Sequence, residues 1–182
     1  MSDLDTDKLR GRRVIVVNTS YERLPFANYL FFGDRRWFVE HQARVLKKFE
    51  GQIVTGSRMV RTDRILTMQK VKPPPGITRK RHQVVYQRTS LQGAINLALH
   101  LVGQGGRIVL LGADMKRSND GRSHHHSPHL WGVKDGCWDK QMQELRLVSE
   151  PLENFGIEIV NTSMESKIDW WPKVPFAEVL AW

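Results

Sequence analysis

Short apolar runs alternate along the chain with longer stretches of helical periodicity. The short runs are rich in β-branched residues, which is typical of strands buried on both faces. They occupy Arg13–Asn18, Tyr29–Asp34, Gln52–Gly56, Gln83–Gln87, Arg107–Gly112 and Gly156–Asn161. Apolar residues at helical spacing predict helices over Arg35–Phe49, Leu91–Val102 and Trp138–Phe155. This alternation predicts an α/β fold with a parallel, doubly wound sheet, helices on both faces and Arg107–Gly112 among the central strands.

Two proline-containing segments interrupt this pattern. The stretch KPPPG at Lys72–Gly76 cannot continue a helix or a central strand. Because its neighbours are basic and it offers little apolar surface to bury, we expect Lys70–Arg81 to form a mobile loop around residues 70–82 that is poorly ordered without a ligand. Pro151 is expected to kink or restart the last helix.

The composition is that of one globular domain. The chain has 182 residues, 40% of them apolar, which is enough for one core over residues 1–182. No apolar run approaches the roughly 20 residues that span a bilayer, and the first residues lack the apolar core of a secretion signal. The single cysteine, Cys137, excludes an internal disulfide framework. We therefore expect a soluble, cytoplasmic protein without a membrane partner.

The positive charge is concentrated in one segment. Between Gly51 and Ser90 there are nine basic residues and one acid, Asp63, so this segment carries +8 of the net charge of +9. The basic residues are Arg58, Arg61, Arg64, Lys70, Lys72, Arg79, Lys80, Arg81 and Arg88. Such a concentration indicates an anionic partner, either a phosphorylated small molecule or nucleic acid bound through residues 58–88. A solvated basic face is the alternative.

Polar residues follow almost every predicted strand. They are Asn18-Thr19-Ser20, Gly33-Asp34-Arg35, Thr55-Gly56-Ser57, Thr89-Ser90, Asp114 and Asn161-Thr162-Ser163. Ligands of open parallel sheets bind at the carboxyl ends of the strands, where helix N-termini also point. The sequence therefore predicts a polar cleft at this edge, although each serine or threonine can also serve as a helix cap.

Carboxylates and histidines supply the candidate chemistry. Asp34 and Asp114 each follow a strand and are suited to Mg²⁺ or a ribose hydroxyl, or alternatively to an Asx-turn. Four of the seven histidines lie between His124 and His129, without a recognised zinc spacing. In an extended loop, His124 and His126 point to the same side, where they can contact a phosphate or act as general acid. The alternatives are that the histidines bind zinc or that they belong to a surface loop without a binding or catalytic role.

A series of short motifs follows in an order typical of a known family. They are N-T-S after the first strand, G-D-R-R-W-F at Gly33–Phe38, S-L-Q-G-A-I-N-L-A at Ser90–Ala98, L-L-G-A-D-M at Leu110–Met115, then H-H-H, and I-V-N-T-S-M-E-S at Ile159–Ser166. From about Leu9 to Leu180, the chain resembles small bacteriophage and prophage proteins of the 6-hydroxymethylpterin diphosphokinase-like (MptE-like) family. This family is related in fold to some bacterial sialyltransferases.

The resemblance implies a Rossmann-like three-layer domain with a nucleotide or nucleotide-sugar site at the strand ends. The positions that match the family motifs are Asn18, Asp34, Ser90, Asn96, Asp114, His124, His126 and Asn161. Family members usually begin with an additional strand and a Gly-Gly-Pro-Ser-like loop, which Met1–Arg10 does not contain. Either the start was assigned too late, or this is a shortened form without one wall of its phosphate site. A missing strand also favours pairing with another chain, as in a homo-oligomer.

Three functions follow as hypotheses. The first is a nucleotide-dependent transferase that moves a pyrophosphoryl or glycosyl group with the help of Mg²⁺ on Asp34 and Asp114. Its catalytic residues are expected to be Asp114, His124 and His126. Its nucleotide and phosphate contacts are expected to be Asn18, Asp34, Ser90, Asn96, Arg79, Lys80, Arg81, Asn161 and Ser163. The second is a nucleotide-binding protein without catalysis, and the third is a nucleic-acid-binding accessory protein of a phage.

Overall fold

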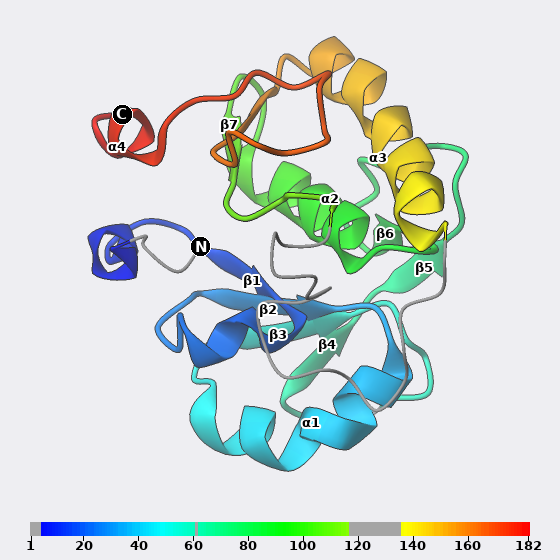
Figure 1. Ribbon diagram of the computed structural model, residues 1–182. Helices are drawn as coiled ribbons and strands as arrows, with labels where there is room; N and C mark the ends of the chain where they lie inside the picture. Colours follow the sequence, from blue (N-terminus) through cyan, green and yellow to red (C-terminus); the bar gives the residue numbers. More distant parts are fainter. Residues whose placement is uncertain (1–4, 61, 117–135) are drawn as a thin grey trace.

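The computed structural model describes residues 5–60, 62–116 and 136–182, and Figure 1 shows their arrangement. The strands are β1 (Ile15–Val17), β2 (Tyr29–Phe32), β3 (Gln52–Thr55), β4 (Ile65–Thr67), β5 (Gln69–Val71), β6 (Gln83–Val85), β7 (Arg107–Leu110) and β8 (Glu158–Asn161). The helices are α1 (Arg35–Lys48), α2 (Ser90–Val102), α3 (Cys137–Asn154) and α4 (Phe176–Leu180), with 3₁₀ helices η1 (Thr6–Leu9) and η2 (Asn18–Glu22).

All strand ladders of the described residues are parallel. One sheet has the order β1-β2-β3-β4, while β5 pairs with β6 and β7 pairs with β8. The sequence-based prediction of an α/β fold with mainly parallel strands is therefore confirmed.

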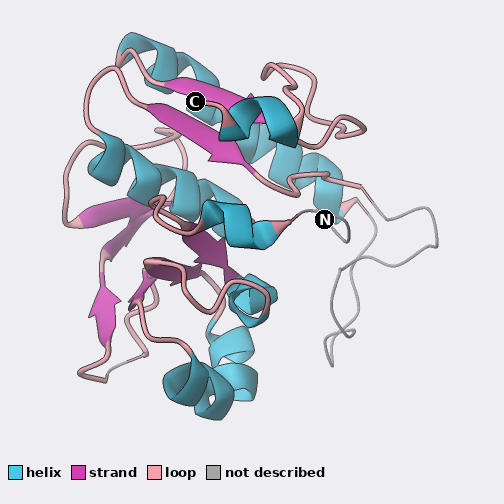
Figure 2. Ribbon diagram, turned by 90° about the vertical axis from the view of Figure 1, so that its left-hand side faces the viewer, coloured by secondary structure: helices cyan, strands magenta, loops and turns pink. Residues whose placement is uncertain are grey.

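The predicted central position of Arg107–Gly112 is wrong. Within the described residues, β7 pairs with β8 alone, and Figure 2 shows these two strands apart from the other strands. Helix α2 packs against β7 and α3 packs against β8, so their apolar side chains are covered without a large sheet. An apolar run in the sequence indicates that a strand is buried on both faces. Helices that pack against a two-stranded sheet bury its strands in the same way, so the run does not indicate a central position in a large sheet.

Helices α1 and α2 cover opposite faces of the β1–β4 sheet (Figure 1). Helix α1 begins at Asp34, whose carboxylate accepts a hydrogen bond from the N–H of Arg36 at 2.8 Å. It buries Trp37, Phe38 and Val45 against the sheet. Helix α2 begins after Thr89, whose hydroxyl accepts the N–H of Leu91. Because α2 also contacts β6 and β7, it is buried along most of its length.

Helix α3 runs without interruption from Cys137 to Asn154, although it contains Pro151. The expectation that this proline restarts the helix is therefore wrong, because it lies in the last turn, where few hydrogen bonds are lost. A proline has no N–H to donate to the carbonyl four residues earlier, which here belongs to Leu147. Gly76 packs against this carbonyl so closely that a β-carbon on it would overlap the oxygen.

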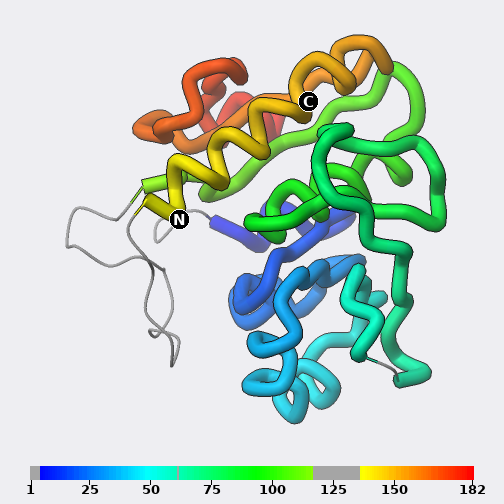
Figure 3. Tube along the Cα trace, turned by 90° about the vertical axis from the view of Figure 1, so that its right-hand side faces the viewer, coloured from blue at the N-terminus to red at the C-terminus, as the bar shows by residue number. Residues whose placement is uncertain are grey.

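Part of the proline-rich segment packs against helix α3. It begins with β5, and Ile77 is only 4% exposed in a core cluster that also contains Val148 and Leu152 of α3. Figure 3 shows the chain after β5 reaching the C-terminal half of α3. Ile77 is thus a buried exception to the expectation that residues 70–82 bury little apolar surface, and their mobility without a ligand stays a prediction.

None of the helices in the described part of the chain is both long and apolar enough to cross a membrane.

Candidate functional site

The carboxyl ends of β1, β2 and β3 lie at one edge of their sheet, because the three strands are parallel. Helices α1 and α2 both begin at this edge. The N–H of Gly33, just before α1, donates a hydrogen bond of 3.1 Å to Oγ of Ser90, the first residue of α2. Two helix N-termini, with their exposed N–H groups, are thus held side by side.

Tyr86 fixes the loops that leave β2 and β3. Its ring is buried, and its hydroxyl donates to the carbonyl of Gly33 at 3.3 Å. A β-carbon on Gly33 would lie 2.6 Å from this ring, and one on Gly56 would lie 2.7 Å from it. Both positions therefore require glycine, because any side chain would overlap the tyrosine. Burial raises the pKa of Tyr86 to about 12, so its hydroxyl stays protonated.

Lys70 lies against the ring of Tyr86. Its ammonium group is 4.2 Å from the centroid of the tyrosine ring, which is the geometry of a cation–π interaction. Burial lowers the pKa of Lys70, the charge of Lys72 lowers it further, and the carboxylates of Glu144 and Asp34 oppose both effects. The ammonium group of the half-buried Lys70 thus lies within electrostatic reach of Asp34, just before α1, and of Glu144 in α3.

Glu144 connects α3 to the beginning of α2. Its side chain is buried, and one oxygen accepts the N–H of Arg88 at 2.8 Å. The other oxygen lies 3.4 Å from Nε of the same arginine. We call Asp34, Lys70, Tyr86, Arg88, Ser90 and Glu144 the carboxyl-edge cluster. It contains two cations, Lys70 and Arg88, and two carboxylates, Asp34 and Glu144, beside two helix N-termini, which present N–H donors to an anion.

Asn18 follows β1 and Asn161 is the last residue of β8, so both lie at strand ends, as the sequence predicts. Asn18 has a φ of 50°, and its side-chain oxygen is buried without a hydrogen-bond partner in the described residues. Asn161 is buried, with its amide donating to the carbonyl of Ala113 at 3.1 Å and its oxygen accepting the N–H of Ser163 at 3.0 Å. Asn161 and Ser163 therefore join the ends of β7 and β8.

Asn96 does not lie at the carboxyl edge. It is buried within α2, where its oxygen accepts the N–H groups of Thr78 and Val85 and its amide donates to the carbonyl of Thr78. These hydrogen bonds attach the proline-rich segment to α2. The geometry gives Asn96 a structural role, since its polar atoms already have protein partners.

Arg79, Lys80 and Arg81 lie at the opposite edge. They precede β6, and Arg79 and Arg81 line a pocket with Gly103, which follows α2. A helix of 13 residues is about 20 Å long. The structure therefore does not bring these cations together with Asp34 and Ser90 into one site.

Asp34 and Asp114 are the residues expected to bind Mg²⁺. Both oxygens of Asp34 contact the guanidinium of Arg36, the shorter N–O distance being 2.8 Å. Asp114 is half-buried after β7, and its carbonyl accepts the N–H of Lys167 at 3.0 Å. No group of three or more His, Cys, Asp or Glu side chains suited to a metal occurs in residues 5–60, 62–116 and 136–182. Mg²⁺ binding by Asp34 and Asp114 stays a prediction.

His124, His126 and their neighbours His125 and His129 lie outside the described residues. Their predicted phosphate contacts and catalytic role therefore stay predictions.

Sequence reasoning missed the parts that Lys70, Tyr86 and Glu144 play at this edge. Lys70 belongs to the basic segment, which was the one signal for it in the sequence. Glu144 carried no signal, because an acid in an amphipathic helix is usually on the solvated face.

Comparison of the chain with family models, with curated proteins and with solved structures finds no match.

Proposed function

We propose that the carboxyl-edge cluster binds the phosphates of a nucleotide or nucleotide-sugar, and that the protein is a nucleotide-dependent transferase of pyrophosphoryl or glycosyl groups. The observation that carries the proposal is Lys70, a half-buried cation held over Tyr86 beside the N-termini of α1 and α2. The proposal includes a Rossmann-like three-layer arrangement, supported by the position of α1 and α2 on opposite faces of a parallel sheet.

Electrostatics favours a phosphate over a neutral ligand at this edge. Helix N-termini present partial positive charge and N–H donors to an anion. Lys70 and Arg88 add full charges, and the partial burial of Lys70 strengthens its interaction with a ligand because water screens it less. Glu144 offsets part of the charge of both, which keeps the cluster stable before an anion arrives.

In a transfer reaction, the cluster would stabilise negative charge that develops on the leaving phosphate. Lys70 and the N–H groups at the start of α2 would hold the phosphate, while Ser90 and Tyr86 keep the loop at Gly33 in place. Asp114, His124 and His126 are the proposed groups for proton transfer and charge stabilisation. The donor and acceptor would bind on the same edge, so that their reacting atoms meet there.

The experiment is thermal stabilisation by nucleoside diphosphates, nucleoside triphosphates and nucleotide-sugars, each with and without Mg²⁺. A ligand at 100 times its Kd stabilises the folded protein by about 2.7 kcal/mol, which gives a clear rise in Tm. We expect one of these classes to raise the Tm, and Lys70→Met to abolish the rise.

The matched control is Lys72→Met, which removes an exposed lysine two residues away on the same segment. This variant is expected to keep the rise in Tm. If no class of nucleotide stabilises the protein, or if both variants lose the same amount, the proposal is wrong. Incubation of the stabilising nucleotide with the protein and detection of released phosphate or diphosphate then distinguishes a transferase from a binding protein.

A further inference from the structure

The pocket that Arg79 and Arg81 line with Gly103 lies at the opposite end of α2 from the carboxyl-edge cluster, and we call this end the amino edge. It has a volume of about 130 Å³. Its wall is formed by residues before β6, at the end of α2 and just after it, and before β8, including Arg79, Arg81, His100, Gln104, Phe155 and Ile157. The pocket thus combines an apolar side, formed by Phe155 and Ile157, with a polar and basic side.

The basic side chains around this pocket have no acidic partners among the described residues. No ion pair in that part of the chain joins Arg79, Lys80 or Arg81 to a carboxylate. Arg13 places a further guanidinium at this end of α2. It donates a hydrogen bond of 2.5 Å to the carbonyl of Leu101 in the last turn of the helix. Burial, and to a smaller extent the charge of Arg81, lower the pKa of His100, although its hydrogen bond to Gln83 opposes them.

An aromatic ring is part of the same surface. The guanidinium of Arg79 lies 4.9 Å from the centroid of the half-buried Phe155 ring. A planar cation next to an aromatic ring at a pocket is a surface on which a nucleobase stacks. The surrounding cations belong to two separate segments of the chain, Arg13 and residues 79–81, and this spread suits successive phosphates better than a single one.

We propose that this amino edge binds single-stranded nucleic acid, with one base in the pocket beside Phe155 and Arg79 and the backbone along Arg13, Lys80 and Arg81. A single strand is required because a base in a duplex is stacked and paired and does not reach a pocket. This site is independent of the nucleotide site proposed above, since the two lie at opposite ends of α2.

A purely structural role is the competing explanation for part of this charge. Basic side chains stabilise the C-terminus of a helix, as Arg13 does at Leu101. Such a role changes the stability of the folded chain but not the salt dependence of binding to an oligonucleotide. Arg79, Lys80 and Arg81 are exposed, so their substitution tests binding with little effect on the fold.

The experiment is fluorescence anisotropy with labelled single-stranded DNA and RNA of about 12 nucleotides, which matches the site sizes of such proteins. We expect the affinity to fall steeply between about 50 and 200 mM salt. Arg79→Gln, Arg81→Gln and Lys80→Gln should each reduce the slope of log affinity against log salt by about 0.7. Phe155→Leu should weaken binding roughly tenfold without a change in slope.

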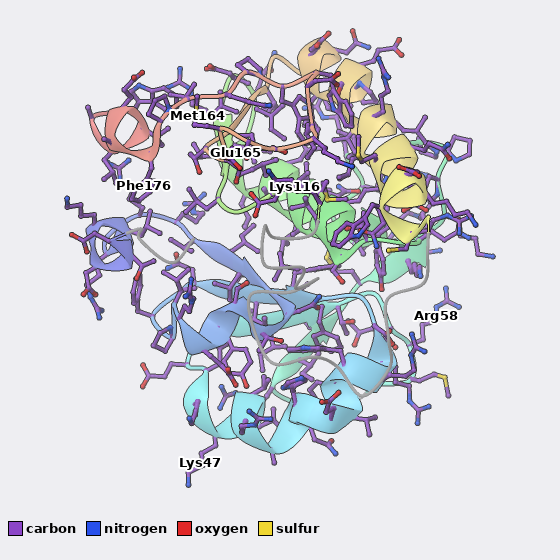
Figure 4. All side chains as sticks on the ribbon, in the orientation of Figure 1. Lys47, Arg58, Lys116, Met164, Glu165 and Phe176 are labelled. Atoms are coloured by element: carbon purple, nitrogen blue, oxygen red, sulfur yellow. The ribbon has the colours of Figure 1, made fainter. Side chains whose placement is uncertain are left out.

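Two matched controls, labelled in Figure 4, remove the same charge elsewhere. Arg58→Gln lies in the same basic segment but after β3, and Lys47→Gln lies in the last turn of α1. Both are expected to keep the wild-type slope, and all variants are checked by Tm. The proposal is wrong if the controls lower the slope as much as Arg79→Gln does. It is equally wrong if a duplex binds as tightly as a single strand, if only mononucleotides or inorganic phosphate bind, or if nothing binds.

Discussion

The ammonium group of Lys70 lies 4.2 Å from the centroid of the Tyr86 ring, whose hydroxyl in turn donates to the carbonyl of Gly33. This relationship joins β5, β6 and the loop before α1 at one point. The lysine is held over an aromatic face and not extended into water, so its charge is directed along the carboxyl edge. Lys70 therefore lies beside the residue that holds the loop before α1 in place.

The charge of Lys70 should make anion binding sensitive to alkaline pH. Burial lowers the pKa of Lys70, so the ammonium loses its proton at a lower pH than an ordinary lysine. Only the protonated form attracts an anion. We expect the affinity for pyrophosphate, measured by titration calorimetry, to fall as the pH rises from about 7 to 10. In Lys70→Arg, which stays charged, this decline should disappear, and an equal decline in that variant contradicts the role of Lys70.

The hydroxyl of Tyr86 should contribute to stability. Tyr86→Phe removes the hydrogen bond to Gly33 but keeps the ring, so we expect a loss of about 1 kcal/mol in the free energy of unfolding. Urea denaturation measures this loss. Tyr29→Phe is the control, because the half-buried hydroxyl of Tyr29 has no hydrogen bond among the described residues. Equal losses in both variants contradict the assigned contact.

Local pattern was sufficient for most helices and strands of this fold. The predicted run Gln52–Gly56 became β3, and Arg35–Phe49 became α1, each within one residue at its ends. Such runs are apolar and flanked by residues that end them, so burial and boundary are both visible in the sequence. Strands β4 and β5 were missed because Leu66, Thr67 and Gln69 are exposed, which leaves no apolar face in the pattern.

The site depended on contacts that no local pattern contains. Asp34 and Ser90 follow strands, and the structure places both at one edge. Lys70 reaches that edge only because β5 pairs with β6 and thus lies beside Tyr86. Glu144 reaches it because α3 packs on α2. Arg79 lies at the other edge because of the direction of β6. The sequence groups Arg79 with the other basic residues by position in the chain, and this grouping contains no information on strand direction.

The fit between Gly76 and α3 should tolerate no side chain. A β-carbon on Gly76 would overlap the carbonyl oxygen of Leu147, and a backbone atom in a helix cannot move away easily. Gly76→Ala should therefore lower the free energy of unfolding by at least about 1–3 kcal/mol, as overpacking does. Lys72→Ala, at an exposed position in the same segment, is the control and should change stability far less. Chemical denaturation compares the two, and a Gly76→Ala variant as stable as the wild type contradicts this packing.

The burial of His100 should make the protein less stable in mild acid. Burial is the main reason why the pKa of His100 is lowered, and the charge of Arg81 acts in the same direction. The unfolded chain, in which the histidine has its ordinary pKa of about 6.5, then binds more protons than the folded chain. The contribution of the neutral His100 to the free energy of unfolding is therefore complete above about pH 6.5. It decreases as the pH falls through the pKa of His100 in the folded state.

Removal of the imidazole should remove this part of the acid sensitivity. We expect His100→Gln to lose less stability than the wild type between about pH 7.5 and 5.5, measured as the change in urea midpoint. His82→Gln is the control, because it removes an exposed histidine on the same edge and should keep the wild-type difference between the two pH values. If His100→Gln loses as much stability in acid as the wild type, the buried imidazole is not the group that titrates. If His82→Gln reduces the loss instead, the acid sensitivity belongs to the exposed surface of this edge.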